Sequence, residues 1–511
     1  MDTIRKIFRL MAIARIMARH DALFPLEMLD APPLALKLAR LLAPVKRKSD
    51  RRPGERLALA LQELGPSFIK LGQALSVRPD LVGGQIAEDL GQLRDRLPPF
   101  PAETARGLIA EELGRPVDEL FTDFDDRPVA AASVAQVHFA RVQDADGEVR
   151  DVAVKIARPG VADAFARDMS LFMWLARQIE RRQPSMRRLK PVEVVRTLQD
   201  SIDLELDFRM EAAAADELAE NFPADPDFYV PAVDWARTGR GVMTLERLNG
   251  IRIDDTDALL SQGVDLAELS EKVIRIFLRQ TLNNGFFHAD MHHGNLFVMP
   301  DGRVGAVDFG IMGRLDRKTV LFMAEMLGAF IAGDYRRAAE VHFEAGYVPS
   351  HKSVEVFAQA CRSIGAPIRG LSGDQISIGR LLAQLFAITE TFDMQTRPEL
   401  LLLQKTMVTV EGVATGLNPD LNFWEASEPV IRAWADENAS AEAVIADHLA
   451  DGIKLARKIP DLIRHADTLI VQAERQAQPQ AGNDTAGKGR GNIALLALLA
   501  AGAALLVSLL H

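Results

Sequence analysis

Apolar positions change their spacing repeatedly along the chain, which predicts helices and strands in succession. Helical spacing is found over residues 3–20, 66–76, 192–221, 266–284 and 318–331. Strand-like runs occupy residues 134–142, 149–156, 228–233, 241–245, 296–299 and 303–307. From residue 318 to about 476 the pattern continues as successive amphipathic helices. The predicted fold class is α+β, with a small sheet followed by a largely helical region.

Two of these short runs, residues 296–299 and 303–307, flank the tripeptide Pro300-Asp301-Gly302. An Asp-Gly pair between apolar-rich runs is a strong signal for a β-hairpin. The hairpin would fold the chain back and bring Asp308 beside the loop that carries Asp290 and Asn295. Three groups that can handle a metal ion or a proton are therefore expected to converge on one pocket.

That loop reads His288-Ala289-Asp290-Met291-His292-His293-Gly294-Asn295, and Asp308-Phe309-Gly310 follows the hairpin. In kinase-type phosphoryl transfer, a loop Asp orients or deprotonates the acceptor, while an Asn five residues later and a further Asp hold Mg²⁺. Ala289 stands where an Arg is usual, which indicates an atypical kinase. The clustered His288, Asp290, His292 and His293 also allow a zinc site. No Cys or Glu stands beside them at ligand spacing, and Mg²⁺ accounts better for the hairpin with Asp308.

The second strand-like run contains Val152-Ala153-Val154-Lys155, the pattern in which a kinase lysine holds the α- and β-phosphates. A lysine within a buried strand is costly unless a partner neutralises it. The partner is expected on the helix predicted at 192–221, which offers Glu205, Asp207 and Glu211, and Glu211 is favoured.

The nucleotide loop should precede the first strand, and the sequence there is Pro128-Val129-Ala130-Ala131-Ala132-Ser133, without glycine. Glycines let a backbone approach phosphates closely, and alanines present their N–H groups less freely. We therefore expect a stiffer loop and an altered nucleotide preference. After the sheet, Glu246-Arg247-Leu248-Asn249-Gly250 is predicted to be the hinge, whose backbone would bind adenine.

The segment after Asp308 is short. Residues 310–316 lead directly into the helix predicted at 318–331. An ordinary protein kinase has some tens of residues here, an activation segment that ends in Ala-Pro-Glu. The platform that holds a peptide substrate is therefore missing.

Composition narrows the class of protein. The chain has 511 residues, 48% apolar and 26% charged, as expected for a globular protein with a sizeable core. The single cysteine, Cys361, excludes a disulfide framework and fits a reducing compartment. A net charge of −11 argues against a general nucleic-acid binder. The helix at 3–20 is nevertheless basic, and it either lies on an anionic membrane surface or packs on the body as an ordinary surface helix.

The C-terminal region predicts a membrane anchor. Residues 473–492 are rich in Gln, Ala, Gly and Asn, which is typical of a flexible linker. Residues 493–510 are all apolar or small, and as a helix they would span about 27 Å of a hydrocarbon core roughly 30 Å thick. Lys488 and Arg490 precede this run and favour a cytoplasmic location for the globular body. We therefore expect a single C-terminal anchor in the inner membrane.

Together these motifs resemble the UbiB family of atypical kinase-like proteins of ubiquinone biosynthesis. The resemblance covers residues 65–316 and depends on the order and spacing of Lys70-Leu71-Gly72-Gln73, residues 130–138, Glu205-Leu206-Asp207 and the loop at 288–295. Taken alone, Lys70 and Gln73 are an ordinary pair on one helical surface. The sequence departs from the family at Met291 and His293, where prolines are usual, and at Ala214, where Asn is common.

The resemblance implies a bilobal kinase-like fold that binds ATP or ADP with Mg²⁺. It implies that Lys155 and Glu211 form an ion pair, that Asp290 is the catalytic-loop Asp, and that Asn295 and Asp308 bind Mg²⁺. Lys70 and Gln73 would lie over the pocket, in contact with Glu205 and Asp207, where a protein kinase binds its peptide. The expected nucleotide-contacting residues are Ala130, Ala131, Ala132, Ser133, Val134, Gln136, Val137, Lys155, Glu205, Asp207 and Glu246.

The predicted domains are an N-terminal helical extension (1–100), a kinase-like N-lobe (101–250), a helical C-lobe (251–472), the linker (473–492) and the anchor (493–510). The resemblance implies an ATPase or phosphotransferase that acts on a small or lipid-like substrate. Its expected partners are quinone-biosynthesis enzymes, prenylated phenol or quinone intermediates and membrane lipid.

The alternative is a pseudokinase scaffold that organises those enzymes or lipids without chemistry, and the complete pair of metal ligands argues against it. A polyprenylphenol hydroxylase, an older description of the family, is not supported by the residues. No Gly-x-Gly-x-x-Gly follows a strand, and the sequence has no flavin or haem signature.

Overall fold

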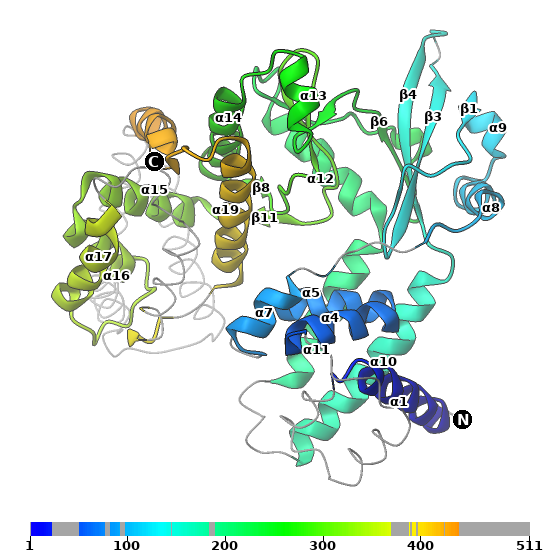
Figure 1. Ribbon diagram of the computed structural model, residues 1–511, viewed down its shortest axis with the longest axis horizontal. Coiled ribbons are helices and arrows are strands. Elements are labelled where there is room, and N and C mark those ends of the chain that lie inside the picture. Colours follow the sequence, from blue (N-terminus) through cyan, green and yellow to red (C-terminus); the bar gives the residue numbers. More distant parts are fainter. Residues whose placement is uncertain are drawn as a thin grey trace, which may run out of the picture. The chain divides into compact units, whose positions relative to one another are not determined.

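The described part of the computed structural model comprises residues 2–22, 51–76, 82–91, 93, 98–144, 146–182, 190–368, 388, 391–394, 397–423 and 425–438. The chain divides into two compact units, Met1–Ala435 and Asp436–His511, and every element named below lies in the first. Sheets and helices share this unit (Figure 1), so the predicted α+β class is confirmed.

The N-terminal helices of the described part are α1 Asp2–Arg19, α4 Pro53–Leu64, α5 Pro66–Ser76 and α7 Gly84–Leu90. α1 confirms the helix predicted at residues 3–20, and α5 confirms the one predicted from Pro66. Gly65 joins α4 to α5 at φ 104°, a backbone angle that residues with a Cβ rarely adopt. Leu61 and Phe68 pack in an apolar cluster with Phe165 of α10 (Val161–Arg182).

The first sheet has the strand order β1-β3-β4-β6, with β2 paired to β3. Its strands are β1 Asp123–Phe124, β2 Ala130–Ala131, β3 Ala135–Gln143, β4 Val149–Ala157 and β6 Val242–Glu246. Lys155 of β4 lies opposite Val137 of β3 and Met243 of β6. The neighbouring Val154 and Ile156 turn to the other face, where they pack with α8 (Ala102–Leu113) and α9 (Val117–Leu120). Lys155 therefore projects from the face that α8 leaves uncovered.

The stretch 192–221 was predicted as one helix, and this prediction is wrong. The structure has α11 Pro191–Glu205 and α12 Phe208–Asn221. Asp207 interrupts the helix with φ −107° and ψ 92°, and its carboxylate accepts the N–H of Arg209 as the N-cap of α12. The break places Glu205 and Glu211 on separate helices.

A second sheet has the order β5-β10-β9-β7, formed by β5 Phe228–Tyr229, β7 Ile251–Arg252, β9 Leu296–Val298 and β10 Val304–Ala306. β9 and β10 pair antiparallel, which confirms the predicted hairpin. The run at 228–233 was expected to belong to the same small sheet as residues 241–245, but β5 pairs parallel with β10 instead. Phe228 is buried in the core beside that pairing, while Val233 makes an isolated bridge to Leu245 of the first sheet.

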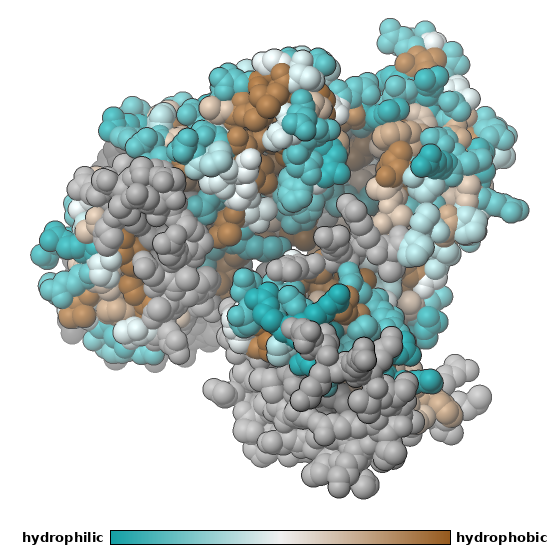
Figure 2. All heavy atoms as spheres, in the orientation of Figure 1, coloured by the Kyte–Doolittle hydropathy of each residue, from teal (hydrophilic) through white to brown (hydrophobic). Residues whose placement is uncertain are grey.

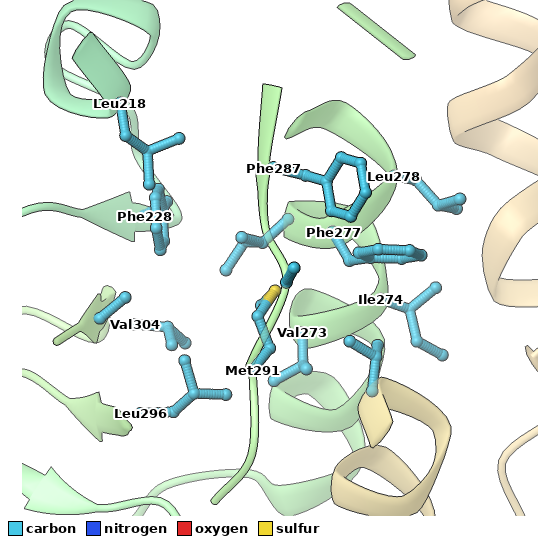
Figure 3. Packing of buried hydrophobic residues seen from close by; sticks show 14 of the residues in the cluster. Leu218, Phe228, Val273, Ile274, Phe277, Leu278, Phe287, Met291, Leu296 and Val304 are labelled. Atoms are coloured by element: carbon cyan, nitrogen blue, oxygen red, sulfur yellow. The ribbon is translucent and has the colours of Figure 1, made fainter. Parts of the chain in front are cut away.

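The remaining described elements are the short helices η2 Trp235–Arg237 and α13 Thr256–Ser261, α14 Leu266–Arg279, a π-helical turn Gln280–Asn284, β8 Phe286–His288 paired with β11 Met312–Arg314, α15 Arg317–Ala332, α16 Tyr335–Glu344, α17 Val354–Ile368 and α19 Pro398–Leu417. α14 with its wider last turn confirms the helix predicted at 266–284, and α15 confirms the one at 318–331. Phe277, Phe287, Met291 and Leu296 lie together in the main core around β8 (Figure 3). On the face shown in Figure 2, polar side chains surround smaller apolar patches.

Among the described residues, we find no helix with both the length and the apolar character needed to cross a membrane. The predicted inner-membrane location with a C-terminal anchor is corrected accordingly, because the described structure gives it no support. Residues 473–492 and 493–510, to which the linker and the anchor were assigned, lie outside the described part of the chain.

Candidate nucleotide-binding and catalytic site

Lys155 lies at the centre of the site. Its ammonium group donates to both carboxylate oxygens of Glu211, at 2.7 and 2.9 Å, and to Oδ1 of Asp308 at 3.1 Å. Glu211 comes from α12, and Asp308 follows β10. Three segments that are distant in the sequence therefore meet at one amine, and the expected contact between Lys155 and Glu211 is present.

One cation shared by two carboxylates determines the electrostatics of the site. Burial lowers the pKa of Lys155, but the charges of Asp308 and Glu211 outweigh it and leave this pKa above its ordinary value. The charge of Lys155 lowers the pKa of Asp308 to about 2. Burial raises the pKa of Glu211, whose side chain is 7% exposed, to about 7, and the charge of Asp308 adds to this effect. Lys155 and Asp308 therefore stay charged, while Glu211 titrates near neutral pH.

Asp308 adopts a left-handed backbone conformation with φ 63°, which costs about 1–2 kcal/mol in a residue other than glycine. Its neighbours hold it there. The N–H of Val307 donates to the carbonyl of Asn295 at 2.9 Å, and the buried ring of Phe309 lies 5.5 Å from the ring of His288. The side chain of Asp308 remains 53% exposed, so a fixed backbone presents an accessible carboxylate.

The buried imidazole of His288 connects the loop at 288–295 to the segment that carries Asp308. Its Nδ1 accepts the N–H of Asp290 at 3.1 Å, which assigns the proton to Nε2, and Nε2 donates to the carbonyl of Val307 at 3.1 Å. Burial lowers the pKa of His288 and keeps the ring neutral, as these two bonds require. Its backbone N–H donates to Oε1 of Gln280 at 2.8 Å. Sequence reasoning missed Gln280, because no local pattern marks it.

Asn295 is fixed against the same loop. Its Nδ2 donates to the carbonyl of Asp290 at 3.1 Å, and its N–H donates to the carbonyl of His292 at 2.9 Å. This orientation leaves Oδ1 as an acceptor, and Asp308 supplies a carboxylate. Oxygen ligands of this kind are those that Mg²⁺ prefers, so the two residues fit the ion. The side chain of Asp290 is 28% exposed, and Nε2 of His292 lies 3.7 Å from its Oδ2.

The histidines of the loop do not form a zinc centre in the described structure. No group of three or more His, Cys, Asp or Glu side chains that could hold a metal ion occurs among the described residues. The ring of His288 is engaged with the backbone on both nitrogens. Nε2 of His293 lies 3.9 Å from Oδ2 of Asp254, whereas Nε2 of His292 lies 3.7 Å from Oδ2 of Asp290. The zinc alternative therefore gains no support.

The alanine-rich loop precedes β3 and is tied to the sheet. Ala130 and Ala131 pair with Val137 and Gln136 of β3. The N–H of Ala132 donates to the carbonyl of Ala135 at 2.8 Å and closes the turn. Nε of Arg158, a residue that sequence reasoning missed, donates to the carbonyl of Ala132 at 2.6 Å. Ser133 and Val134 are buried, the latter in the apolar cluster with α5 and α10.

The structure corrects the expected role of Gln136. Strand residues alternate between faces, and Gln136 lies opposite Ile156, whereas Val137 lies opposite Lys155. The Gln136 side chain therefore turns away from the face that bears Lys155. It accepts the N–H of Phe100 at 2.9 Å and donates to the carbonyl of Phe100 and to His138. Val137 remains on the face expected to meet a nucleotide.

Lys70 forms an ion pair with Glu205, where α5 meets the end of α11. This contact agrees with the expectation that the Lys70 helix would contact Glu205. Asp207 differs, because it caps α12 and pairs with the guanidinium group of Arg209 at 2.6 and 2.8 Å. The side chain of Arg209 lowers the pKa of Asp207. Gln73 lies one turn after Lys70 on α5, and its role over the pocket stays a prediction.

Glu246 ends β6 at the start of the predicted hinge. Its carboxylate accepts the hydroxyl group of Tyr229 and the N–H of Ala232. Burial is the main cause that raises the pKa of Tyr229 to about 12, and this hydrogen bond adds to the effect. Glu246 therefore fixes the hinge to the segment around β5, and a contact with nucleotide stays a prediction.

Comparison with known proteins identifies the family. Residues 92–342 match the ABC1 atypical kinase-like domain, and residues 361–422 match the UbiB helical domain. The Probable protein kinase UbiB of Marinobacter nauticus is 38% identical to this chain, over 99% of the chain and 94% of the relative. The chain belongs to the UbiB family. UbiB relatives from Pseudomonas putida (strain W619) and Xylella fastidiosa are 38% and 37% identical, and each alignment covers 93% of this chain and 87% of the relative.

One solved structure is similar to this chain in fold. The complex of Rv3197 with erythromycin from Mycobacterium tuberculosis aligns with this chain at a TM-score of 0.52 and 26% sequence identity. The alignment covers 73% of this chain and 93% of the Rv3197 chain. Lys155, Glu211 and Asp308 all lie within the ABC1 match, so the kinase-like part of the predicted fold is confirmed. In this chain, α5 with Lys70 precedes that match, and α19 lies in the match to the UbiB helical domain.

Proposed function

We propose that this UbiB-family chain binds ATP with Mg²⁺ beside Lys155 and either hydrolyses it or transfers its γ-phosphoryl group to a small, lipid-like acceptor. The activity would support ubiquinone biosynthesis, with prenylated phenols or quinone intermediates as acceptors and enzymes of that pathway as partners. The observation that carries the proposal is the convergence of Lys155, Glu211 and Asp308 beside the loop that bears Asp290 and Asn295.

Each of these residues has a role in the proposal. Lys155, which its two carboxylates keep charged, donates to the α- and β-phosphate oxygens, and Glu211 holds its amine in place. Asp290 orients or deprotonates the acceptor hydroxyl group or the attacking water. Asn295 and Asp308 would hold Mg²⁺, and the ion would supply positive charge against the phosphates.

A small acceptor is favoured over a peptide by the segment after Asp308. β11 follows almost at once, and α15 begins at Arg317. The ion pair between Lys70 and Glu205 further connects the N-terminal helices to the end of α11. The names of the curated relatives point to a protein acceptor instead. Transfer of labelled phosphate to protein in trans is the outcome that would favour that reading.

Release of inorganic phosphate by the purified full chain tests the proposal. Asp308→Asn should lower the rate at least about a hundredfold, because it removes a charged ligand from the metal site. Asp301→Asn is the matched control, since Asp301 is a half-exposed residue of the nearby hairpin turn that pairs with Arg303. It should leave the rate within about twofold. Equal phosphate release by the wild type and Asp308→Asn would assign the activity to another site.

One observation favours the scaffold alternative. The N–H of Ala132 is engaged with the carbonyl of Ala135, so this loop amide is already bonded within the protein. Complementation of a quinone-deficient strain discriminates between the readings. Asp290→Asn should fail to restore quinone synthesis if chemistry is required, whereas full rescue would favour the scaffold.

A further inference from the structure

A contact between the catalytic loop and α19 has no role in the function proposed above. The hydroxyl group of Thr406, fully buried in α19, lies 3.1 Å from the carbonyl oxygen of Ala289, 117 positions earlier in the chain. A hydroxyl group donates and a carbonyl accepts, so Thr406 donates to the residue directly before Asp290. α19 lies within the region that matches the UbiB helical domain, outside the match to the kinase-like domain.

The peptide group of Ala289 influences the direction of the Asp290 side chain. The N–H of Ala289 donates to the carbonyl of Ile311 at 3.0 Å, beside the pairing of β8 with β11. Ala289 and Met291 are 1% and 0% exposed, whereas the side chain of Asp290 between them is 28% exposed. The Ala289 carbonyl and the Asp290 N–H belong to one planar unit. A displaced carbonyl would therefore also move the N–H that bonds to His288.

α19 is well placed to hold this carbonyl, because it packs on the core beneath the loop. Val410, Val413 and Leu417 of α19 belong to the same buried cluster as Phe277 of α14 and Phe287 of β8. Figure 3 shows the two phenylalanines lying together in that core. Close-packed interiors transmit small displacements instead of absorbing them. A helix fixed in this way can hold a backbone group in a constant position.

We infer that Thr406 is a positioning residue for Asp290, through which the UbiB helical domain sets the position of the catalytic loop. The inference rests on the proposed function, since it takes Asp290 to be the residue that orients the acceptor. Thr406 acts through the backbone of Ala289 and touches neither nucleotide nor acceptor.

The hydroxyl group of Thr406 has a second acceptor, and the chain offers a control for it. Its Oγ1 also lies 2.8 Å from the carbonyl of Leu402, one turn earlier in α19, a bond that helical threonines often make. Thr409 makes the same kind of bond to Lys405 at 3.0 Å. Because a hydroxyl group has a single proton, Thr406 shares it between the carbonyls of Leu402 and Ala289. Thr409→Val therefore removes a bond within α19 only, whereas Thr406→Val removes the proton shared with Ala289.

Steady-state ATP turnover of the full chain tests the inference. Thr406→Val should lower kcat about tenfold, because a buried carbonyl loses its donor next to Asp290. The KM for ATP should stay within about twofold, since Lys155 and its partners are untouched. Thr406→Ser, which keeps the hydroxyl group, should retain most of kcat, and Thr409→Val should match the wild type. Equal kcat values for Thr406→Val and Thr409→Val would overturn the inference.

Amide hydrogen exchange provides a readout that does not depend on turnover. The N–H of His292 donates to the carbonyl of Asp290 at 2.8 Å and reports on the geometry of the loop. Thr406→Val should speed its exchange about tenfold, while protection of β3 and β4 stays unchanged. If Thr406→Val does not fold, Thr406→Ala takes its place in both measurements. A wild type without ATP turnover would refute the proposed function, whereas unaltered exchange at His292 would refute the anchoring by Thr406.

Discussion

Replacement of Glu211 by glutamine is predicted to stabilise the nucleotide-free protein at alkaline pH. The Glu211 carboxylate is 7% exposed and shares the charge of Lys155 with Asp308. Burial raises its pKa from 4.5 to about 7. Between these values the folded protein holds a proton that the unfolded chain has released. The free energy of unfolding therefore falls as pH rises from about 4.5 to about 7, and the loss is complete above pH 7.

The pKa difference gives the magnitude of the effect. A rise from 4.5 to about 7 corresponds to about 3 kcal/mol of lost stability at pH 8 and to about 1 kcal/mol at pH 5. Glutamine resembles the neutral acid in shape, and its amide oxygen can still accept from Lys155. Glu211→Gln should therefore be about 3 kcal/mol more stable than the wild type at pH 8 and about 1 kcal/mol more stable at pH 5.

Urea unfolding without nucleotide, followed by tryptophan fluorescence at pH 5 and pH 8, measures this difference. Glu217→Gln is the matched control, because Glu217 lies on the same helix but forms a surface pair with Arg314 at 2.7 Å. Its effect should stay below about 0.5 kcal/mol at both pH values. A wild type that is more stable than Glu211→Gln at pH 8 would refute the reasoning, since the charge of Lys155 would then outweigh the burial of Glu211.

Two further predictions concern packing and hydrogen bonding around the site. Gly313→Ala would place a Cβ against the buried ring of Phe287 and should lower stability by about 3 kcal/mol. Gly328→Ala is the control, because a Cβ added at this position of α15 would meet no other atom. It should leave stability unchanged or raise it slightly, and thermal unfolding measures both variants. Gln136→Ala should lower stability by about 2 kcal/mol, because the backbone of Phe100 loses its partners. Calorimetric titration with ADP should give an affinity within about threefold of the wild type, and a larger loss would place Gln136 on the nucleotide face.

The central geometry of the site could be predicted because its signals are local or physically demanding. Asp301 and Gly302 specify the hairpin between β9 and β10, and that hairpin alone carries Asp308 back to the catalytic loop. A lysine in a strand whose neighbours are buried requires a carboxylate partner, and Glu211 is that partner for Lys155. In both cases one short stretch of sequence contains the constraint that fixes the structure.

The features that were missed depend on information that a short stretch does not contain. The face of Gln136 follows from the register of β3 against β4, and a change of one residue reverses it. An Asp such as Asp207 suits a ligand contact and an N-cap equally well, and only the break between α11 and α12 decides. β5 has two residues, so burial of Phe228 in the core determines which sheet it joins. Gln280 and Arg158 act on distant backbone atoms, and sequence spacing says nothing about such contacts.

The charges around Lys155 link the stability of the chain to its proposed chemistry. The raised pKa of Glu211 predicts a less stable nucleotide-free protein above neutral pH, and Asp308 is held in a left-handed conformation that is unfavourable for its residue type. A cation bound by Asp308 would reduce the repulsion that Asp308 exerts on Glu211, and would lower the pKa of Glu211 towards its ordinary value. On this prediction, glutamine at position 211 would give a more stable empty protein. A buried carboxylate whose pKa is raised in the empty site is therefore an argument for a site built to hold a charged ligand.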